Sequence, residues 1–205
     1  MLIRIHPVTP DPRQLKKVVE ILKNGGVIIY PTDGVYAFGC DIQKSRAVER
    51  VAQLKGIKPE KADFSFVFDE LRHITEYTRP VDTPVYKLLK SCLPGPYTFI
   101  LNANNSVPKL FKNNKRTVGI RIPDNAICRA IVTELGSPII SSSVHDEDDI
   151  IEYTTDPELI HERYKDLVDA VVDGGYGALV PSTIVDCTGN VPELIRQGAG
   201  EVDFE

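Results

Sequence analysis

The chain has 205 residues, of which 42% are hydrophobic and 26% are charged, and this composition is typical of one large globular domain. The formal net charge of -5 argues against a protein whose whole surface binds nucleic acid, although a local basic cleft is compatible with it. No apolar run has the length of a signal peptide or approaches the ~20 residues of a membrane span. We therefore expect a cytoplasmic protein that binds no membrane.

The cysteines and histidines form no metal-binding or redox motif in the sequence. The four cysteines lie far apart, and the four histidines are equally scattered. So few cysteines in a chain of this size are not typical of a disulfide scaffold. We expect reduced and mostly buried thiols at Cys40, Cys92, Cys128 and Cys187.

The spacing of apolar residues predicts strands and helices that alternate along the chain. The first half is expected to hold a strand over Leu2–Ile5, a helix between Asp11 and Asn24, a strand over Val27–Tyr30, a helix capped by Ser45, a strand over Phe64–Phe68, a helix over Thr83–Lys90 and a strand over Tyr97–Leu101. The second half is expected to hold a strand over Thr117–Ile122, a helix from Asp124, a strand over Pro138–Ile140, a helix over Pro157–Lys165, and strands over Val168–Val172, Thr183–Asp186 and Leu194–Arg196. Without a linker or a repeat, this order favours one α/β domain over residues 1–205 with a mixed sheet.

Polar clusters follow several of these apolar runs directly. They are Pro31–Tyr36, Thr117–Arg121, Ser141–Ser143 and Pro181–Thr183. In open α/β sheets, ligands bind just beyond strand ends, where loops meet. Hydroxyl, Lys and Arg side chains are the groups that bind a nucleotide triphosphate or a carboxylate. The clusters therefore predict a cleft for a small phosphate-bearing ligand.

Each cluster also has a purely structural interpretation. The Pro31–Gly34 tetrapeptide has the composition of a turn, and the three serines could form a plain loop or a helix cap. Arg121 could lie on a half-exposed strand, and the lysines at 55, 58 and 61 could form a solvated charged face. The acidic run at 146–149 is read as a surface loop rather than a metal site, because its spacing matches no known ligand pattern. Neither a P-loop nor a GxGxxG motif is present.

Five stretches in this order resemble the YrdC-like family, the threonylcarbamoyl-AMP synthases, and especially its YciO-like branch. The resemblance runs from about Ile5 to Gly200. The stretches are Tyr30–Gly39 (YPTDGVYAFG), Leu93–Leu101 (LPGPYTFIL), Val118–Pro123 (VGIRIP), Pro181–Asp186 (PSTIVD) and Ile195–Gly198 (IRQG).

The resemblance implies a YrdC/RibB-like fold, in which a twisted mixed parallel/antiparallel sheet forms a concave basic cleft. It also implies a reaction in which L-threonine, bicarbonate and ATP give threonylcarbamoyl-adenylate and pyrophosphate, with Mg²⁺ accompanying ATP. The product supplies the threonylcarbamoyl group for the N6-threonylcarbamoyladenosine modification of tRNA. In such a reaction the protein mainly positions the reactants and neutralises their charge.

The resemblance assigns binding roles to nine residues and no catalytic group. The residues that it implies for ATP are Lys55, Lys58, Thr117, Ser143 and Arg196. The residues that it implies for threonine are Thr32, Arg121, Ser141 and Ser182.

Three positions depart from the pattern of the family. Gly34 stands where the synthases carry a hydroxyl, and Ile57 replaces the arginine of a Lys-x-Arg motif. His145 replaces the asparagine of a Ser-x-Asn motif. Losing a substrate contact inside a built site can cost several powers of ten in discrimination. We therefore expect the residues that bind phosphate to be kept better than those that recognise threonine.

Two alternatives remain open at the level of the sequence. The chain could be a module that binds tRNA or double-stranded RNA without catalysis, through a basic face that holds Lys55, Lys58, Lys61, Lys112, Lys115 and Arg116. Alternatively, the same scaffold could bind another nucleotide ligand, with Gly34 and His145 as parts of a reshaped pocket.

Overall fold

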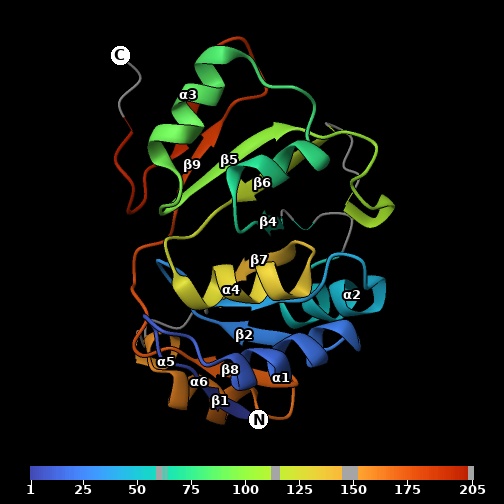
Figure 1. Cartoon of the computed structure of the whole chain (residues 1–205), viewed down its shortest axis with the longest axis vertical. Helices are drawn as coiled ribbons and strands as arrows, with labels where there is room; N and C mark the ends of the chain where they lie inside the picture. Colours follow the sequence, from blue (N-terminus) through green and yellow to red (C-terminus); the bar gives the residue numbers. More distant parts are fainter. Residues whose placement is uncertain (59–61, 63, 112–115, 145–151, 203–205) are drawn as a thin grey trace.

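A computed structural model describes residues 1–58, 62, 64–111, 116–144 and 152–202. These residues form one α/β domain around a single sheet of ten strands (Figure 1). The strands are β1 (Leu2–Arg4), β2 (Ile28–Tyr30), β3 (Ala37–Gly39), β4 (Ser65–Val67), β5 (Tyr97–Asn102), β6 (Thr117–Arg121), β7 (Ile139–Ser143), β8 (Ala170–Asp173), β9 (Thr183–Asp186) and β10 (Glu193–Arg196). The helices are α1 (Pro12–Lys23), α2 (Ser45–Leu54), α3 (Thr83–Cys92), α4 (Ala126–Leu135), α5 (Glu152–Thr155) and α6 (Pro157–Tyr164), with 3-10 turns at η2 (Leu71–Glu76) and η3 (Lys109–Phe111).

The sheet is mixed, as the sequence predicts. Its strand order is β1-β8-β2-β3-β7-β4-β6-β5-β9-β10. The parallel pairs are β1 with β8, β2 with β8, β4 with β6, and β5 with β9. The other neighbouring pairs are antiparallel. The strand β7 joins the two halves of the sheet, because it pairs with β3 on one side and with β4 on the other.

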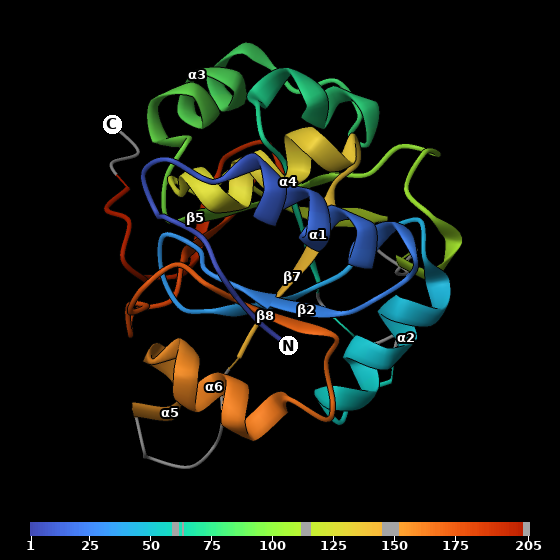
Figure 2. The same cartoon turned by 60° about the horizontal axis from the view of Figure 1, so that its bottom comes forward.

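Two hydrophobic clusters cover the sheet. The smaller one packs the buried stripes of α1 and α4 against strands that include β1 and β8, and these two helices lie side by side in Figure 2. The larger one gathers apolar residues of α2, α3 and α6 with the strand residues Phe66, Phe99 and Ile140. Ile139 and Ile140 belong to different clusters, because neighbouring residues of a strand point to opposite faces.

The helix α1 forms for the reasons that its sequence indicates. A carboxylate oxygen of Asp11 accepts hydrogen bonds from the backbone amides of Arg13 and Gln14 at 2.7 and 3.1 Å, and Pro12 begins the helix. The predicted stripe of Leu15, Val18, Val19 and Leu22 is buried, as expected of an amphipathic helix.

The structure corrects several sequence predictions. Asn125, not Asp124, caps α4 and accepts from the Cys128 amide at 3.0 Å. Helix α2 begins at Ser45 without a side-chain cap. The three serines at 141–143 continue β7 and do not form a loop, because β3 and β4 both pair with them. The strand β3 was not expected, since it is short and lies inside a motif that reads as a turn. No helix in the described ranges is long and apolar enough to cross a membrane.

Candidate functional site

Arg121 and Asp33 form a buried ion pair at the end of β6. The guanidinium Nη2 lies 3.0 Å from Asp33 Oδ1, and the two side chains are 6% and 7% exposed. The other carboxylate oxygen of Asp33 accepts the backbone amide of Asp124 at 2.9 Å, just before α4. Arg121 Nη1 also donates to Ser141 Oγ at 3.3 Å. Arg121 is therefore a buried and partnered charge rather than a surface residue.

Successive side chains of β6 point to opposite faces of the sheet, and this explains why an arginine can lie at its end. Val118 and Ile120 point into the larger hydrophobic cluster, so Thr117, Gly119 and Arg121 share the opposite face. On that face Gly119 pairs with Ser65, which pairs in turn with Ser141. A Cβ atom on Gly119 would lie 2.9 Å from Ser65 Oγ, so the strands carry small side chains where they meet.

Lys55 reaches the same strands from the end of α2. Its Nζ donates to the backbone oxygen of Ser143 at 2.9 Å. Burial lowers the pKa of the Lys55 ammonium. We use the name polar strip for Asp33, Lys55, Arg121, Ser141 and Ser143, because a hydrogen bond, an ion pair or a shared strand joins each of them to another.

The turn before β3 forms one wall beside the polar strip. Thr32 Oγ1 donates to the backbone oxygen of Val35 at 2.8 Å and accepts the Gly34 amide at 3.0 Å, so it stabilises a tight turn. The Gly34 oxygen accepts the Ala178 amide at 3.0 Å, and a Cβ atom at Gly34 would lie 3.0 Å from the backbone oxygen of Val180. The segment before β9 therefore fills the space that a larger side chain at position 34 would need.

Ser182 and Arg196 come together on the β9–β10 hairpin. Arg196 donates to the backbone oxygen of Ser182 through Nε at 3.3 Å and Nη2 at 2.8 Å. The Ser182 hydroxyl pairs with that of Thr98 at 2.8 Å. Partial burial lowers the pKa of Arg196, and the positive charge of Arg121 adds to this effect.

Lys58 and Thr117, two of the predicted ATP residues, lie outside the polar strip as defined above. Lys58 is exposed. Thr117 lies four residues from Arg121 along β6, about 13 Å away, where it lines a separate pocket with Arg79 and Arg116.

The predicted basic cleft stays a prediction. Lys61, Lys112 and Lys115 lie outside the described residues, as do His145 and the acidic run at 146–149. Within the described ranges, no group of three or more His, Cys, Asp or Glu residues could hold a metal ion.

Sequence reasoning missed Asp33 as a member of the site. The available signal was the carboxylate in Pro-Thr-Asp-Gly together with an arginine on a strand that was otherwise apolar. An arginine buried in that way needs a carboxylate partner.

The fold and much of the sequence are shared with proteins of known structure. Escherichia coli YciO, an uncharacterised protein, is 38% identical over 200 residues, which cover 97% of this chain and 95% of YciO. Its crystal structure matches with a TM-score of 0.92 and covers 100% of this chain and 99% of the YciO chain.

More distant relatives have names that state a function. A protein of Halorhodospira halophila named threonylcarbamoyl-AMP synthase is 27% identical over 139 residues, which cover 68% of this chain and 72% of that protein. The crystal structure of P. abyssi Sua5 complexed with L-threonine matches with a TM-score of 0.84 at 21% identity, covering 97% of this chain and 57% of that one. The family described as "Telomere recombination" (Sua5/YciO/YrdC) matches residues 20–198. The chain therefore belongs to the Sua5/YciO/YrdC family.

Proposed function

We propose that this chain synthesises threonylcarbamoyl-AMP from ATP, L-threonine and bicarbonate. The observation that carries the proposal is the state of Arg121. Its Nη2 is neutralised by Asp33, while its buried Nε–H has no hydrogen-bond partner among the described residues. A buried donor without a partner is costly, and a ligand carboxylate oxygen can accept from it. The names of the distant relatives support the same activity.

The chemistry balances without a covalent intermediate on the protein. The amine of threonine and bicarbonate give a carbamate and water. A carbamate oxygen then attacks the α-phosphorus of ATP, the bond to the β-phosphate oxygen breaks, and pyrophosphate leaves. The protein would hold the two reactants in line and neutralise their negative charge. The product would serve the modification of tRNA.

The proposed roles follow the positions of the residues. Arg121, with the hydroxyls of Ser141, Ser182 and Thr32, would bind threonine. Lys55, already half-buried beside Ser143, would contact the triphosphate, with Lys58, Thr117 and Arg196 as further ATP residues. Mg²⁺ would arrive with ATP, and no step of the proposal depends on a metal ion held by the protein.

The crowding at Gly34 bears on the amino acid. The turn hydroxyl of Thr32 already makes two hydrogen bonds, and Val180 closes the space beside Gly34. We expect weaker discrimination between threonine and valine, its isostere without the hydroxyl, than a site with a free hydroxyl gives, since each lost polar contact lowers discrimination.

Pyrophosphate release tests the proposal. The purified protein is incubated with ATP and bicarbonate, with and without L-threonine, and pyrophosphate is measured together with the adenylate product. Arg121→Lys keeps the positive charge beside Asp33 but loses the planar fork, and we expect it to lower the rate at least tenfold.

The exposed Arg13→Lys change on α1 is the matched control and should leave the rate unchanged. Two outcomes reject the proposal. One is release that does not depend on threonine. The other is a rate that Arg121→Lys and Arg13→Lys leave equally unaffected. Nucleotide binding with threonine silent would instead favour another nucleotide ligand.

A further inference from the structure

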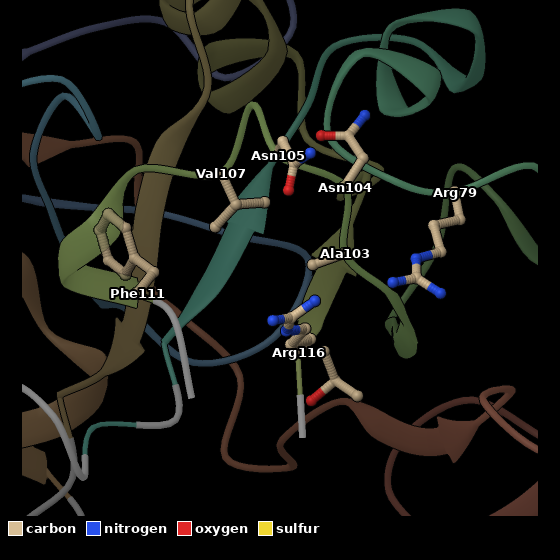
Figure 3. Close-up of a pocket in the computed structure, with 8 residues that line it drawn as sticks. Arg79, Ala103, Asn104, Asn105, Val107, Phe111 and Arg116 are labelled. Carbon is tan, nitrogen blue, oxygen red and sulfur yellow. The ribbon is translucent and has the colours of Figure 1, made fainter. Parts of the chain in front are cut away.

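A pocket lies where the C-terminal end of β5 meets the N-terminal end of β6, away from the ion pair of Arg121 and Asp33. It has a volume of about 360 Å³ and is lined by Arg79, Ala103, Asn104, Asn105, Val107, Phe111, Arg116 and Thr117 (Figure 3). This volume is at the lower end of the range of about 300 to 1,000 Å³ found for small-molecule sites. We propose that this pocket binds the phosphate group of a small phosphorylated molecule.

The charges of the lining support an anion. Arg79 and Arg116 are both exposed, and none of the described residues that line the pocket is acidic. Within the described ranges, neither guanidinium forms an ion pair with a carboxylate, whereas Arg121 does. Their side chains flank Ala103 in Figure 3. Two guanidinium forks at one pocket match the oxygens of a phosphate.

The backbone holds both arginines in place. Ala103 donates its amide to the backbone oxygen of Arg116 at 2.8 Å, and the Arg79 amide donates to the oxygen of Asn102 at 2.8 Å. Arg116 adopts a left-handed conformation with φ of 51°, which a non-glycine residue rarely adopts. These hydrogen bonds, at the end of the β5–β6 pair, therefore fix the backbone positions of Arg79 and Arg116.

The remaining lining indicates how the rest of the ligand would be received. Asn104 is committed to the structure, because its amide nitrogen donates to the backbone oxygens of Glu76 and Thr78 at 2.9 and 3.1 Å. Asn105 is exposed and can offer its amide to a ligand. Val107 and Phe111 form an apolar end of the pocket. The ring of Phe111 packs edge-on against that of Phe66, with 4.8 Å between the ring centroids. A phosphate with a compact organic group fits this division into a charged and an apolar end.

The pocket does not include Arg121 or Asp33. Ala103 and Val107 belong to the larger hydrophobic cluster, and Phe111 packs against it. Thr117 lines the pocket and is also one of the residues proposed for ATP, on the same face of β6 as Arg121. Arg79 and Arg116 have no role in the proposed synthase, so phosphate binding lost in their variants while threonine-dependent pyrophosphate release is kept separates the two proposals.

Calorimetric titration with three probes tests the proposal: inorganic phosphate, ribose 5-phosphate and ribose. We expect saturable binding of ribose 5-phosphate, weaker binding of phosphate and none of ribose. Arg79→Gln and Arg116→Gln should each weaken the binding of ribose 5-phosphate by roughly tenfold to a hundredfold, since each removes a charge-assisted hydrogen bond. Arg13→Gln and Arg121→Lys should leave it unchanged. Amide NMR shifts on binding should be largest at Ala103 and Asn105.

Three results overturn the inference: no binding of either phosphorylated probe, binding that Arg79→Gln and Arg116→Gln both leave intact, or binding that Arg121→Lys abolishes. Binding of an RNA oligonucleotide without binding of ribose 5-phosphate also rejects it, because the pocket would then not be a small-molecule site. Thermal melting of each variant separates loss of binding from loss of folding, and both arginines are exposed, so a fold change is not expected.

Discussion

The two ends of β6 use arginine in opposite ways. At one end Arg121 is buried, paired with Asp33 at 3.0 Å and hydrogen-bonded to Ser141. At the other end Arg79 and Arg116 are exposed beside a pocket, and neither pairs with a described carboxylate. A buried pair fixes the local structure but leaves few donors for a ligand. An unpaired surface arginine costs the fold little and keeps its donors available. The comparison predicts that stability depends on the first end, whereas the second end binds free phosphate and contributes little to stability.

The largest difference should be seen when each arginine is truncated. Arg121→Ala leaves the Asp33 carboxylate buried with only one amide donor, so we expect a loss of about 3 to 5 kcal/mol in the free energy of unfolding. Arg79→Ala should change it by about 0.5 kcal/mol or less, as is usual for surface residues. Urea denaturation measures both. Equal effects of the two substitutions would remove the contrast, and restored stability in Arg121→Ala with Asp33→Asn would confirm its cause.

The second prediction concerns the crowded wall beside the polar strip. Gly34→Ala places a Cβ atom 3.0 Å from the backbone oxygen of Val180. We expect a loss of about 1 to 3 kcal/mol, because the backbone must move to accept it. Gly189 is the matched control, since a Cβ atom there would lie 3.8 Å from the nearest atom, an ordinary contact. If thermal melting shows Gly34→Ala to be as stable as Gly189→Ala, the segment around Val180 is not a fixed wall.

The third prediction separates backbone strain from charge at Arg116. Arg116→Gly and Arg116→Ala both remove the guanidinium, but only glycine adopts a φ of 51° without steric cost. The glycine variant should be more stable than the alanine variant by about 1 kcal/mol. At Arg79, which has no such φ, glycine should be no better than alanine. The reverse order at Arg116, in chemical denaturation, would contradict the left-handed conformation.

The smallest expected effect is a pH dependence at Lys55. Its pKa is lowered in the folded state by burial, so the unfolded chain holds this proton to a higher pH. Stability therefore rises with pH between the lowered pKa and the ordinary value of 10.5. Relative to Lys55→Met, the wild type should gain stability over this window, as measured by denaturation at several pH values. Lys58→Met controls for the loss of an exposed lysine. A difference that falls as pH rises would reverse the sign and reject burial as the cause.

Sequence reasoning predicted the fold well where apolar periodicity decides the structure. The buried stripe of α1 and the strands β2, β5 and β9 were predicted correctly, because the spacing of their apolar residues fits only one type of secondary structure. It failed where pairing partners decide the structure. The serines of β7 have no strand signal of their own, and they form a strand because β3 and β4 flank them.

The candidate site was only partly predictable for a related reason. The hydrogen bond from Lys55 to Ser143 and the contact of Arg121 with Ser141 join residues that the sequence had already singled out. The role of Asp33 and the closure by Val180 depend on loops that meet only in the folded chain. The pocket beside Arg79 and Arg116 likewise depends on the pairing of residues far apart in sequence.

The strand order also sets a condition on how the chain can fold. The strands β2 and β3 form an early hairpin-like pair, but β7 must enter between β3 and β4, and β8 between β1 and β2. Both insertions use segments made late in synthesis, so the N-terminal half exposes unpaired strand edges until residues 139–143 and 170–173 arrive. Pairings of such long range are slow to form. A nascent chain that stops before Ile139 therefore lacks both closing strands, and one that stops between Ser143 and Ala170 still lacks β8, the strand that joins β1 to β2.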